Sequence, residues 1–302
     1  MLSATTAPWW LWVVFTIVAA TAQTFRNAAQ RTLIDSLGTV GATHVRFIFG
    51  LPFAILFLLV VGTATGGLPA LTLASFGWTA FGAISQIAAT ALMLMAMRER
   101  SFVVTTAYIK TEPVQVAIFA TLFLGEHITP VLAAAIVIAT AGVVLLSWPS
   151  RAGREIFSWR PAIYGIVAGG LFAFSAVAFR GGIGALGTAE FVPAATVTLA
   201  LSLAIQTVLL SAWLIWRQPE ALRKIFSLWR VSLPAGALGA FASEMWFLAF
   251  AIQNPAKVRT LALVEILIAG LVSRRLFAQS PTLRDIAGMV LVCVGIVLLF
   301  NG

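Results

Sequence analysis

The stretch TEPVQVAIFATLFLGEHITP at residues 111–130 returns in weaker form as VEILIAGLVSRRLFAQSPTL at residues 264–283, which is 153 residues further along the chain. The two copies align Glu112 with Glu265, and each glutamate lies inside a long apolar run. A duplicated apolar unit with an ionisable residue in each copy is typical of membrane proteins built from internal repeats.

The composition also indicates a membrane protein. Apolar residues make up 61% of the 302 residues and charged residues only 10%, which is more apolar than a soluble domain requires. The net charge of +9 does not predict a nucleic-acid partner, because the basic residues occur singly or in pairs and form no nucleic-acid motif. The single cysteine, Cys293, excludes an intramolecular disulfide, and no metal-ligand or cofactor motif is expected.

The apolar runs predict an all-α integral membrane protein with ten transmembrane helices, since a spanning helix needs about 20 residues. The first repeat is expected at 1–148, a linker at 149–159 and the second repeat at 160–302. An odd number of helices in each repeat inverts the second copy, which predicts two inverted five-helix repeats related by an axis in the membrane plane. The predicted spans are 9–25, 42–62, 72–97, 102–124, 129–148, 160–179, 191–216, 231–252, 258–277 and 283–300.

The distribution of basic residues predicts the orientation. Most lysines and arginines fall in the loops after odd-numbered spans, among them Arg26 after the first span, while few residues such as Arg180 follow an even-numbered span. The positive-inside rule then places the odd loops in the cytoplasm and both termini outside it. We expect a bacterial-type inner membrane as the location.

The repeated motif resembles the EamA-type members of the drug/metabolite transporter superfamily. The residues that carry the resemblance are Glu112-Pro113, Leu124-Gly125-Glu126-His127-Ile128-Thr129 and the glycine-led run 142–146, together with Arg46 in the second span. This resemblance covers the whole chain in span count and implies ten helices, an inverted repeat and alternating access for small metabolites. It also implies cytoplasmic termini. The distribution of basic residues indicates the opposite orientation, and we follow that distribution.

The second copy of the motif departs from the family pattern. It keeps Glu265 and Thr282, but Ile266 stands where proline is usual and Gln279 where a second glutamate is usual. The departure leaves the resemblance specific for the fold rather than for the substrate.

Six ionisable residues inside the predicted spans are the first candidates for function. A charge at the bilayer centre costs at least about 2.5–3.5 kcal/mol, so each one requires an explanation. They are Arg46, Lys110, Glu112, Glu244, Arg259 and Glu265.

Lys110 and Glu112 lie about 200° apart around the fourth span. Pro113 removes a helix hydrogen bond and predicts a kink whose free carbonyl groups line a polar cavity. One interpretation makes Lys110 or Glu112 a ligand for a charged substrate group. The other is an ion pair between helices, for instance Glu112 with Arg46, whereas Arg259 is expected to reach water at the interface.

Glu244 has no acidic counterpart in the first repeat, where Ala91 holds the matching position. Burial would favour its neutral form, which suits proton coupling, and the alternative is a protonated carboxyl that only packs helices. Glu265 and Pro113 are expected to be structural or coupling residues.

Uncharged polar and aromatic side chains complete the predicted substrate site. Gln86 and Thr90 share one face of the third span, and Ser243 matches Thr90 in the second repeat. Tyr108 and Trp246 would form an aromatic wall, although ordinary packing is the alternative for either. His44, Ser85 and Ser175 are further candidates, and Gly165 and Gly169 form a GxxxG pattern that predicts a close helix contact.

We therefore expect a secondary active transporter that moves a small polar or amphipathic metabolite, amino-acid-like in the first instance, with proton coupling or exchange. A flippase for a lipid or a lipid-linked sugar is the alternative, and a non-transporting membrane protein or an intramembrane enzyme is the third. The sequence contains no catalytic dyad, so an enzyme is not expected. The expected partners are the small-molecule substrate and the lipid bilayer, with no nucleic acid.

Overall fold

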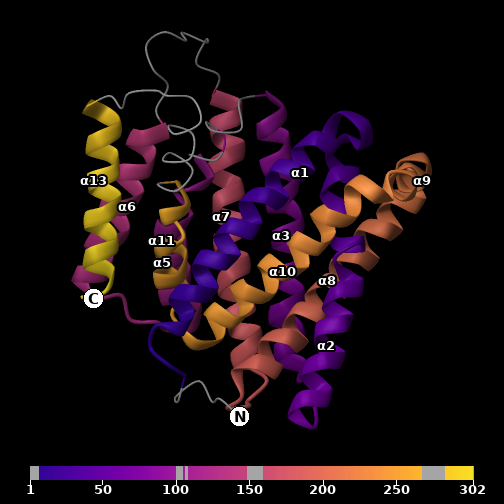
Figure 1. Cartoon of the computed structure of the whole chain (residues 1–302), viewed down its shortest axis with the longest axis horizontal. Helices are drawn as coiled ribbons and strands as arrows, with labels where there is room; N and C mark the ends of the chain where they lie inside the picture. The colour runs from indigo at the N-terminus through magenta and orange to yellow at the C-terminus, as the bar shows by residue number, and fades with distance from the viewer. Residues whose placement is uncertain (1–6, 100–104, 106–107, 148–158, 267–282, 302) are drawn as a thin grey trace.

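The computed structural model describes residues 7–99, 105, 108–147, 159–266 and 283–301, and within these residues it contains helices and no strand. The predicted all-α class is therefore confirmed. The helices are α1 (Leu11–Ile48), α2 (Leu51–Thr65), α3 (Leu73–Glu99), α5 (Glu112–Leu124), α6 (Pro130–Ser147), α7 (Trp159–Gly184), α8 (Phe191–Arg217), α9 (Pro219–Ser227), α10 (Trp229–Ile252), α11 (Pro255–Leu261) and α13 (Leu283–Leu299) (Figure 1).

The protein is a multi-pass membrane protein. In the described part of the chain, five helical segments are long and apolar enough to cross a membrane: Leu11–Thr65, Leu73–Glu99, Ala162–Gly184, Phe191–Arg217 and Trp229–Ile252. Glu112–Leu124, Pro130–Leu146 and Ile286–Leu299 are shorter apolar helices. Parts of the predicted spans 102–124 and 258–277 lie outside the described residues.

The segment Leu11–Thr65 accommodates the first two predicted spans. It is 55 residues long, more than twice what one crossing of about 30 Å requires. Gly38 interrupts the helix with φ 68°, a backbone conformation that glycine adopts most easily. Figure 1 shows the chain turning back beyond this region and descending through α2.

Two of the predicted span ends are wrong. Arg26 was expected in a loop, but it lies within α1 and only 1% of its side chain is exposed. Arg180 was also expected in a loop, but it lies within α7 and donates to the backbone carbonyls of Phe250 and Ala251 at 2.7 and 2.8 Å. Both expectations ended a span at its first charge, whereas these helices continue because each arginine finds partners inside the protein.

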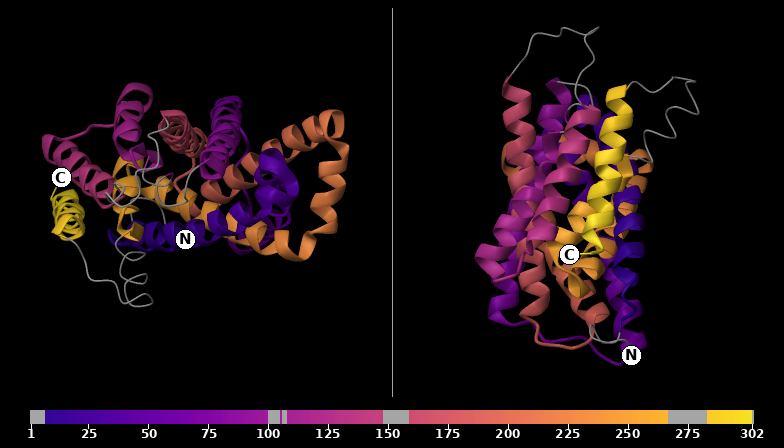
Figure 2. Two further views of the ribbon diagram at one scale, coloured as in Figure 1. Left: turned by 90° about the horizontal axis from the view of Figure 1, so that it is seen from above. Right: turned by 90° about the vertical axis from the view of Figure 1, so that its left-hand side faces the viewer.

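Three antiparallel or crossing helix pairs dominate the packing: α1 with α10, α3 with α7, and α6 with α13. Viewed from above, α6 and α13 lie at one end of the molecule and α2, α8 and α9 at the other (Figure 2). The α1–α10 and α3–α7 pairs lie between these ends, so they enclose the centre of the bundle. The functional side chains described below project from these central helices and from the neighbouring α5 and α11.

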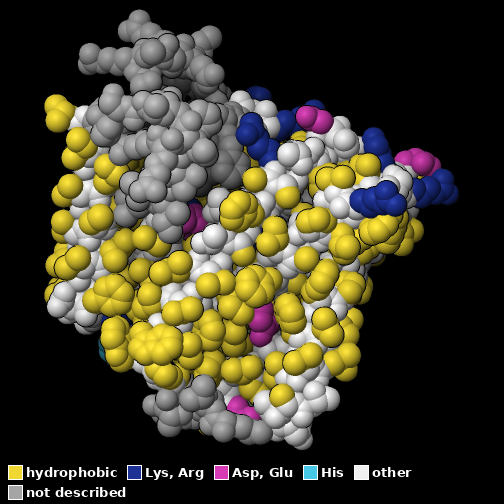
Figure 3. All heavy atoms as spheres, viewed as in Figure 1, with side chains coloured by type: hydrophobic (Ala, Val, Ile, Leu, Met, Phe, Trp, Pro, Cys, Tyr) yellow, Lys and Arg dark blue, Asp and Glu magenta, His cyan; other side chains and the backbone are white. Residues whose placement is uncertain are grey.

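The surface has an apolar middle and a basic end. Yellow side chains cover the middle of the face in Figure 3, and dark-blue basic side chains gather at the end where α9 lies. The short helix α9 contributes exposed Arg223 and Lys224 to this end and buries Ile225 against the bundle. This distribution matches the needs of a protein whose middle contacts acyl chains.

Glycines allow α6 and α13 to approach until their backbones touch. A Cβ atom added at Gly142 would lie 2.7 Å from the carbonyl oxygen of Gly288 and 2.8 Å from the nitrogen of Val292. One added at Gly295 would lie 2.8 Å from the carbonyl oxygen of Ala135. Small residues at such contacts are the usual basis of tight helix association in membranes.

We expect Gly142→Ala to destabilise the protein by about 1–3 kcal/mol, because the methyl group would meet backbone atoms that cannot rotate away. Gly77→Ala is the matched control, since no heavy atom lies within 4 Å of the added Cβ. The control should keep or slightly raise the melting temperature, as alanine favours a helix over glycine. Thermal unfolding of both purified variants in detergent tests this, and equal melting temperatures would contradict the close contact.

Candidate functional site

The helices that carry the duplicated motif are both interrupted at matching positions. A turn at Lys110 and Thr111 precedes α5, and the amide of Thr111 donates to the carbonyl of Tyr108. A turn at residues 262–263 follows α11, and the amide of Glu265 donates to the carbonyl of Ala262. Pro113 stands in the first turn of α5, so the predicted kink is a break in the helix with the proline just after it. Broken helices place backbone polar groups and helix ends inside a membrane protein, where ions and substrates bind.

Two ion pairs connect the broken segments, and each joins one half of the chain to the other. The ammonium group of Lys110 pairs with the carboxylate of Glu265. Nε of Arg259 lies 3.1 Å from Oε1 of Glu112, although neither atom has a well-aligned hydrogen bond within the described part of the chain. Each of these four side chains is at most 11% exposed. Because a buried charge needs a partner, each pair depends on both halves.

These contacts include the ion pair that one interpretation of Glu112 expected. An ion pair between helices is present, but its cation is Arg259 and the expected pairing with Arg46 is wrong. The expectation that Arg259 reaches water is also wrong, because its side chain is 7% exposed. Six residues separate Arg259 from Glu265 in sequence, and only the fold brings Arg259 to the other glutamate.

Aromatic and amide groups surround Arg259. Its guanidinium carbon lies 4.1 Å from the ring centroid of Trp246 and 5.3 Å from that of Phe250. The indole N–H of Trp246 donates to Oε1 of Gln23 at 3.1 Å. Thr24 donates its hydroxyl to Oε2 of Glu265 at 3.3 Å. Trp246 therefore contacts the ion-paired Arg259, and α1 contributes polar residues that the sequence analysis did not single out.

Arg46 joins the two halves through a matched pair of hydroxyl groups. It donates to Oγ1 of Thr90 at 3.3 Å and to Oγ of Ser243 at 3.5 Å. Thr90 and Ser243 hold equivalent positions in the repeat, 153 residues apart. The structure thus brings together three of the predicted site residues around one guanidinium group.

Arg26 is the most important residue that the sequence analysis missed. Its guanidinium donates to Oδ1 of the adjacent Asn27 and interacts electrostatically with Arg46, Arg259 and Glu265. The signal for it was present: Gln23, Arg26, Asn27 and Gln30 follow the i, i+3, i+4, i+7 spacing of one helix face. A polar stripe along a membrane helix predicts a face turned toward the protein interior.

The predicted site residues Glu244 and Gln86 are not part of the two ion pairs. Oε1 of Glu244 lies 2.6 Å from the hydroxyl of Thr196, and its Oε2 has no partner in the described residues. Gln86 accepts a hydrogen bond of 2.8 Å from Gln206 on α8. Within the described part of the chain, neither side chain forms a hydrogen bond or an ion pair with Lys110, Glu112 or Arg259.

The remaining polar candidates make local contacts. The ring of His44 lies 2.9 Å from the hydroxyl of Ser211. Ser175 donates to the carbonyl of Phe172 in its own helix, and Ser85 is buried. These contacts satisfy polar groups within or between neighbouring helices.

Tyr108 contributes to the site through its backbone and its packing against α7. The predicted close contact of the GxxxG pattern is present, because Gly165 lies against the Cβ of Tyr108 and Gly169 against the carbonyl of Ile109. A Cβ at Gly169 would lie only 2.9 Å from that carbonyl oxygen. Glycines on α7 therefore make room for the break before α5.

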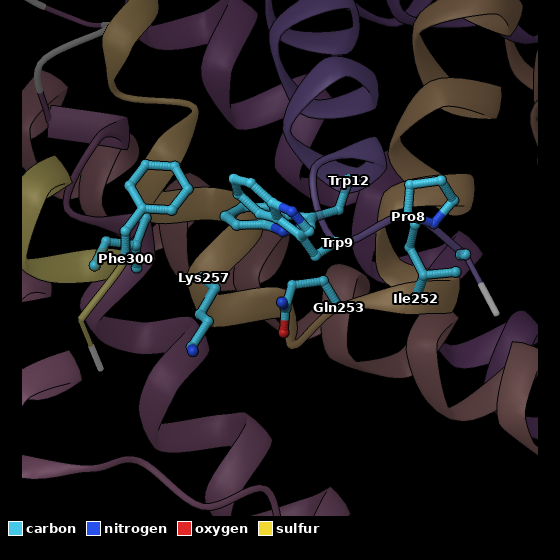
Figure 4. A pocket seen from close by; sticks show the side chains of 9 residues that line it. Pro8, Trp9, Trp12, Ile252, Gln253, Lys257 and Phe300 are labelled. Carbon is cyan, nitrogen blue, oxygen red and sulfur yellow. The ribbon is translucent and has the colours of Figure 1, made fainter. Parts of the chain in front are cut away.

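A separate pocket of about 220 Å³ opens near the start of α1, between Trp9, Trp12, Gln253, Lys257 and Phe300 (Figure 4). The rings of Trp12 and Phe300 lie 5.9 Å apart. Figure 4 shows the ammonium group of Lys257 pointing away from the two tryptophans. The pocket does not include the ion-paired residues, so it is a feature of the rim rather than of the polar centre.

Comparisons with known proteins find a transporter family model over the first half of the chain. Residues 10–148 match the model of the EamA-like transporter family. A solved structure titled "Crystal structure of protein" aligns with a TM-score of 0.66 and 15% identity, covering 94% of this chain and 95% of that chain, and supports the fold alone. No curated protein matches the chain. The protein therefore carries an EamA-like transporter family domain over residues 10–148, in agreement with the resemblance of its sequence motif.

Proposed function

We propose that this protein is a secondary active transporter that moves a small polar or amphipathic metabolite, amino-acid-like in the first instance, by alternating access. The family of residues 10–148 supports a transporter role. The observation that carries the proposal is the pair of buried ion pairs Lys110–Glu265 and Glu112–Arg259, which join the two halves at their broken helices. On this proposal the protein is not an enzyme.

Two contacts between α6 and α13 that are interchanged when the halves of the repeat are exchanged support an inverted repeat. An offset of 153 residues converts Gly142 into Gly295 and Ala135 into Gly288. Gly142 lies against Gly288, and Gly295 lies against Ala135, so exchange of the halves turns one contact into the other. The order of these contacts is that of antiparallel helices, as expected for an axis in the membrane plane.

The same exchange relates the two large central interfaces. In the predicted repeat, α1 corresponds to α7 and α3 to α10, so the α1–α10 pair becomes the α7–α3 pair. Two equivalent interfaces allow the halves to rock to either side of a central site. Such rocking is the general basis of alternating access in inverted-repeat transporters.

The crossed ion pairs suit this movement. Each glutamate of the repeat is neutralised by a cation of the other half, so separating the halves exposes opposite charges on both of them. A charged or zwitterionic substrate, or water, can take the place of a lost partner. The substrate thereby gains affinity from groups that the protein otherwise pairs internally.

Glu244 is our proposed site of proton coupling. The hydroxyl of Thr196 lies 2.6 Å from Oε1 of Glu244 and 2.9 Å from the carbonyl oxygen of Val192. A hydroxyl has one proton and can donate to only one of these acceptors. Donation to the carbonyl leaves Thr196 to accept from a protonated Glu244, which is the neutral form that a buried carboxyl without a cation favours.

The gathering of basic side chains at one end supports the orientation. We propose that the end with α9, where basic side chains gather (Figure 3), faces the cytoplasm of a bacterial-type inner membrane. We further propose that both termini lie on the other side.

We expect the Glu112–Arg259 pair to show strong energetic coupling. Glu112→Gln should destabilise the protein by about 3–5 kcal/mol, because Arg259 would keep an unpaired buried charge. Adding Arg259→Gln should recover much of this loss. Unfolding of the two single variants and the double variant in mixed micelles measures the coupling.

The matched control for this cycle is Glu220 with Arg223, a pair on α9 whose side chains are 82% and 78% exposed. Its coupling should be below about 1 kcal/mol. Equal coupling in the two cycles would show that the buried pair has no special dependence on its partner.

We expect Lys110→Ala to abolish saturable uptake of a radiolabelled amino-acid panel into proteoliposomes, because the variant removes the cation between the halves. Arg223→Gln, on the exposed face of α9, should transport normally. Uptake that survives in Lys110→Ala at the rate of the control would remove Lys110 from the mechanism.

Glu244→Gln should separate transport from its driving force. The neutral amide cannot release a proton, so accumulation driven by an imposed proton gradient should disappear while exchange of labelled for unlabelled substrate continues. Both assays use the same vesicles and the same amino-acid panel. Undiminished accumulation in the variant would exclude Glu244 as the coupling group.

A further inference from the structure

The polar centre contains more cations than carboxylates. Lys110 and Arg259 are neutralised by Glu265 and Glu112. Arg26 and Arg46 interact electrostatically with this cluster, and each side chain is only 1% exposed. Two buried guanidinium groups are therefore left without a carboxylate of their own among the described side chains.

The hydrogen bonds of these two arginines do not replace a counterion. Arg26 donates to the neutral amide of Asn27 at 2.7 and 3.2 Å. Arg46 makes long hydrogen bonds to two hydroxyl groups, and its Nε has no partner among the described residues. Neutral acceptors orient a guanidinium group but leave its charge in place.

The two arginines lie next to each other along α10. A Cβ added at Gly239 would lie 3.3 Å from Cδ of Arg26 and 3.5 Å from Cβ of Arg46, so the glycine leaves space where both side chains pass. Two like charges side by side in a buried region repel each other. An anion between them would offset this repulsion by attracting both guanidinium groups.

No carboxylate among the described side chains supplies that anion. The chain has ten acidic residues, and of these Glu155 and the side chain of Asp285 lie outside the described part. Glu126 pairs with Arg180, Glu220 with Arg223, and Glu244 with Thr196. Of the others with described side chains, Asp35 is exposed within α1, Glu99 is exposed at the end of α3, and Glu190 is half-buried just before α8. Asp285 stands in the first turn of α13, which packs on α6 and α11.

We propose that the transported molecule carries a carboxylate and that this group binds between Arg26 and Arg46. The inference rests on the proposed transport function and specifies its substrate as an organic acid, either a net anion or a zwitterion, rather than an organic cation. Guanidinium groups suit this role because their planar N–H donors match the two oxygens of a carboxylate. Thr90 and Ser243 hold Arg46 from both halves, which places the binding group where the halves meet.

Acetate and acetamide are the probes for a direct test, because they have the same size and differ in charge. Thermal unfolding of the purified full-length protein is followed with each probe at constant ionic strength in chloride. Acetate should raise the melting temperature and acetamide should not, since ligand binding to the native state stabilises it. The absence of an acetate effect, or an equal effect of acetamide or of added chloride, would overturn the proposal.

Substitutions of Arg26 and Arg46 test whether these side chains bind the acetate. Arg46→Gln and Arg26→Gln should weaken the acetate effect on the order of tenfold in apparent affinity, as expected for the loss of a charge-assisted hydrogen bond. Lys257→Gln is the matched control in the rim pocket and should respond to acetate like the unaltered protein. An acetate effect that depends on Lys257 instead of the arginines would place the anion in the rim pocket and refute the assignment.

A second measurement compares the unfolding temperatures of arginine variants without a ligand. Without a ligand, Arg26→Met should unfold at the same or a higher temperature than the unaltered protein, because it removes an unpaired buried charge. Arg259→Met should unfold at a lower temperature, because it leaves Glu112 without its cation. Equal losses in both variants would mean that Arg26 has a structural counterion and would count against the proposal.

The outcomes for binding and for transport are separable. If acetate binds through Arg26 and Arg46 but proteoliposomes transport no labelled acid, the proposed function fails and the anion site stands. If proteoliposomes transport an organic cation while acetate has no effect, the protein is a transporter and the inference about its substrate is wrong.

Discussion

Neutralisation of charge inside the bilayer is the constraint on which the rest of this structure depends. Water is absent from the apolar core, so a charged side chain there is stable only beside a partner. The chain meets this requirement by crossing its ion pairs, with Lys110 on Glu265 and Arg259 on Glu112. Neither half neutralises its own glutamate. Either half alone would be unfavourable in the membrane, because its buried charges would lack partners. The same charged groups hold the two halves together.

Small residues make these contacts geometrically possible. Gly165 and Gly169 on α7 admit the backbone before α5, and Gly239 on α10 admits the side chains of Arg26 and Arg46. Where α6 and α13 meet, Gly142 and Gly295 bring two backbones together. In a membrane, helices have little hydrophobic drive to associate, and close packing with polar contacts takes its place. Packing and charge pairing thus act on the same helices.

Much of the fold is readable from the sequence because each signal is local. The apolar runs predict helices, and Pro113 predicts an interruption of its helix. The ends of the helices were less predictable. Arg26 interrupts an apolar run, and a single-sequence reading ends the span there, whereas α1 continues because the polar stripe of Gln23, Arg26 and Gln30 faces protein instead of lipid.

The site shows the same division between local and long-range information. The sequence by itself determined which residues must be exceptional, since an ionisable group in an apolar run, such as Lys110, Glu112 or Glu265, has few reasons to persist. It also determined that Thr90 and Ser243 are equivalent, because the repeat aligns them. Only the tertiary structure decided the partners: Glu112 contacts Arg259 instead of Arg46, and Arg46 contacts Thr90 and Ser243. The reason is physical, since partner choice depends on distances between helices that lie far apart in the chain, and no local pattern of residues records them.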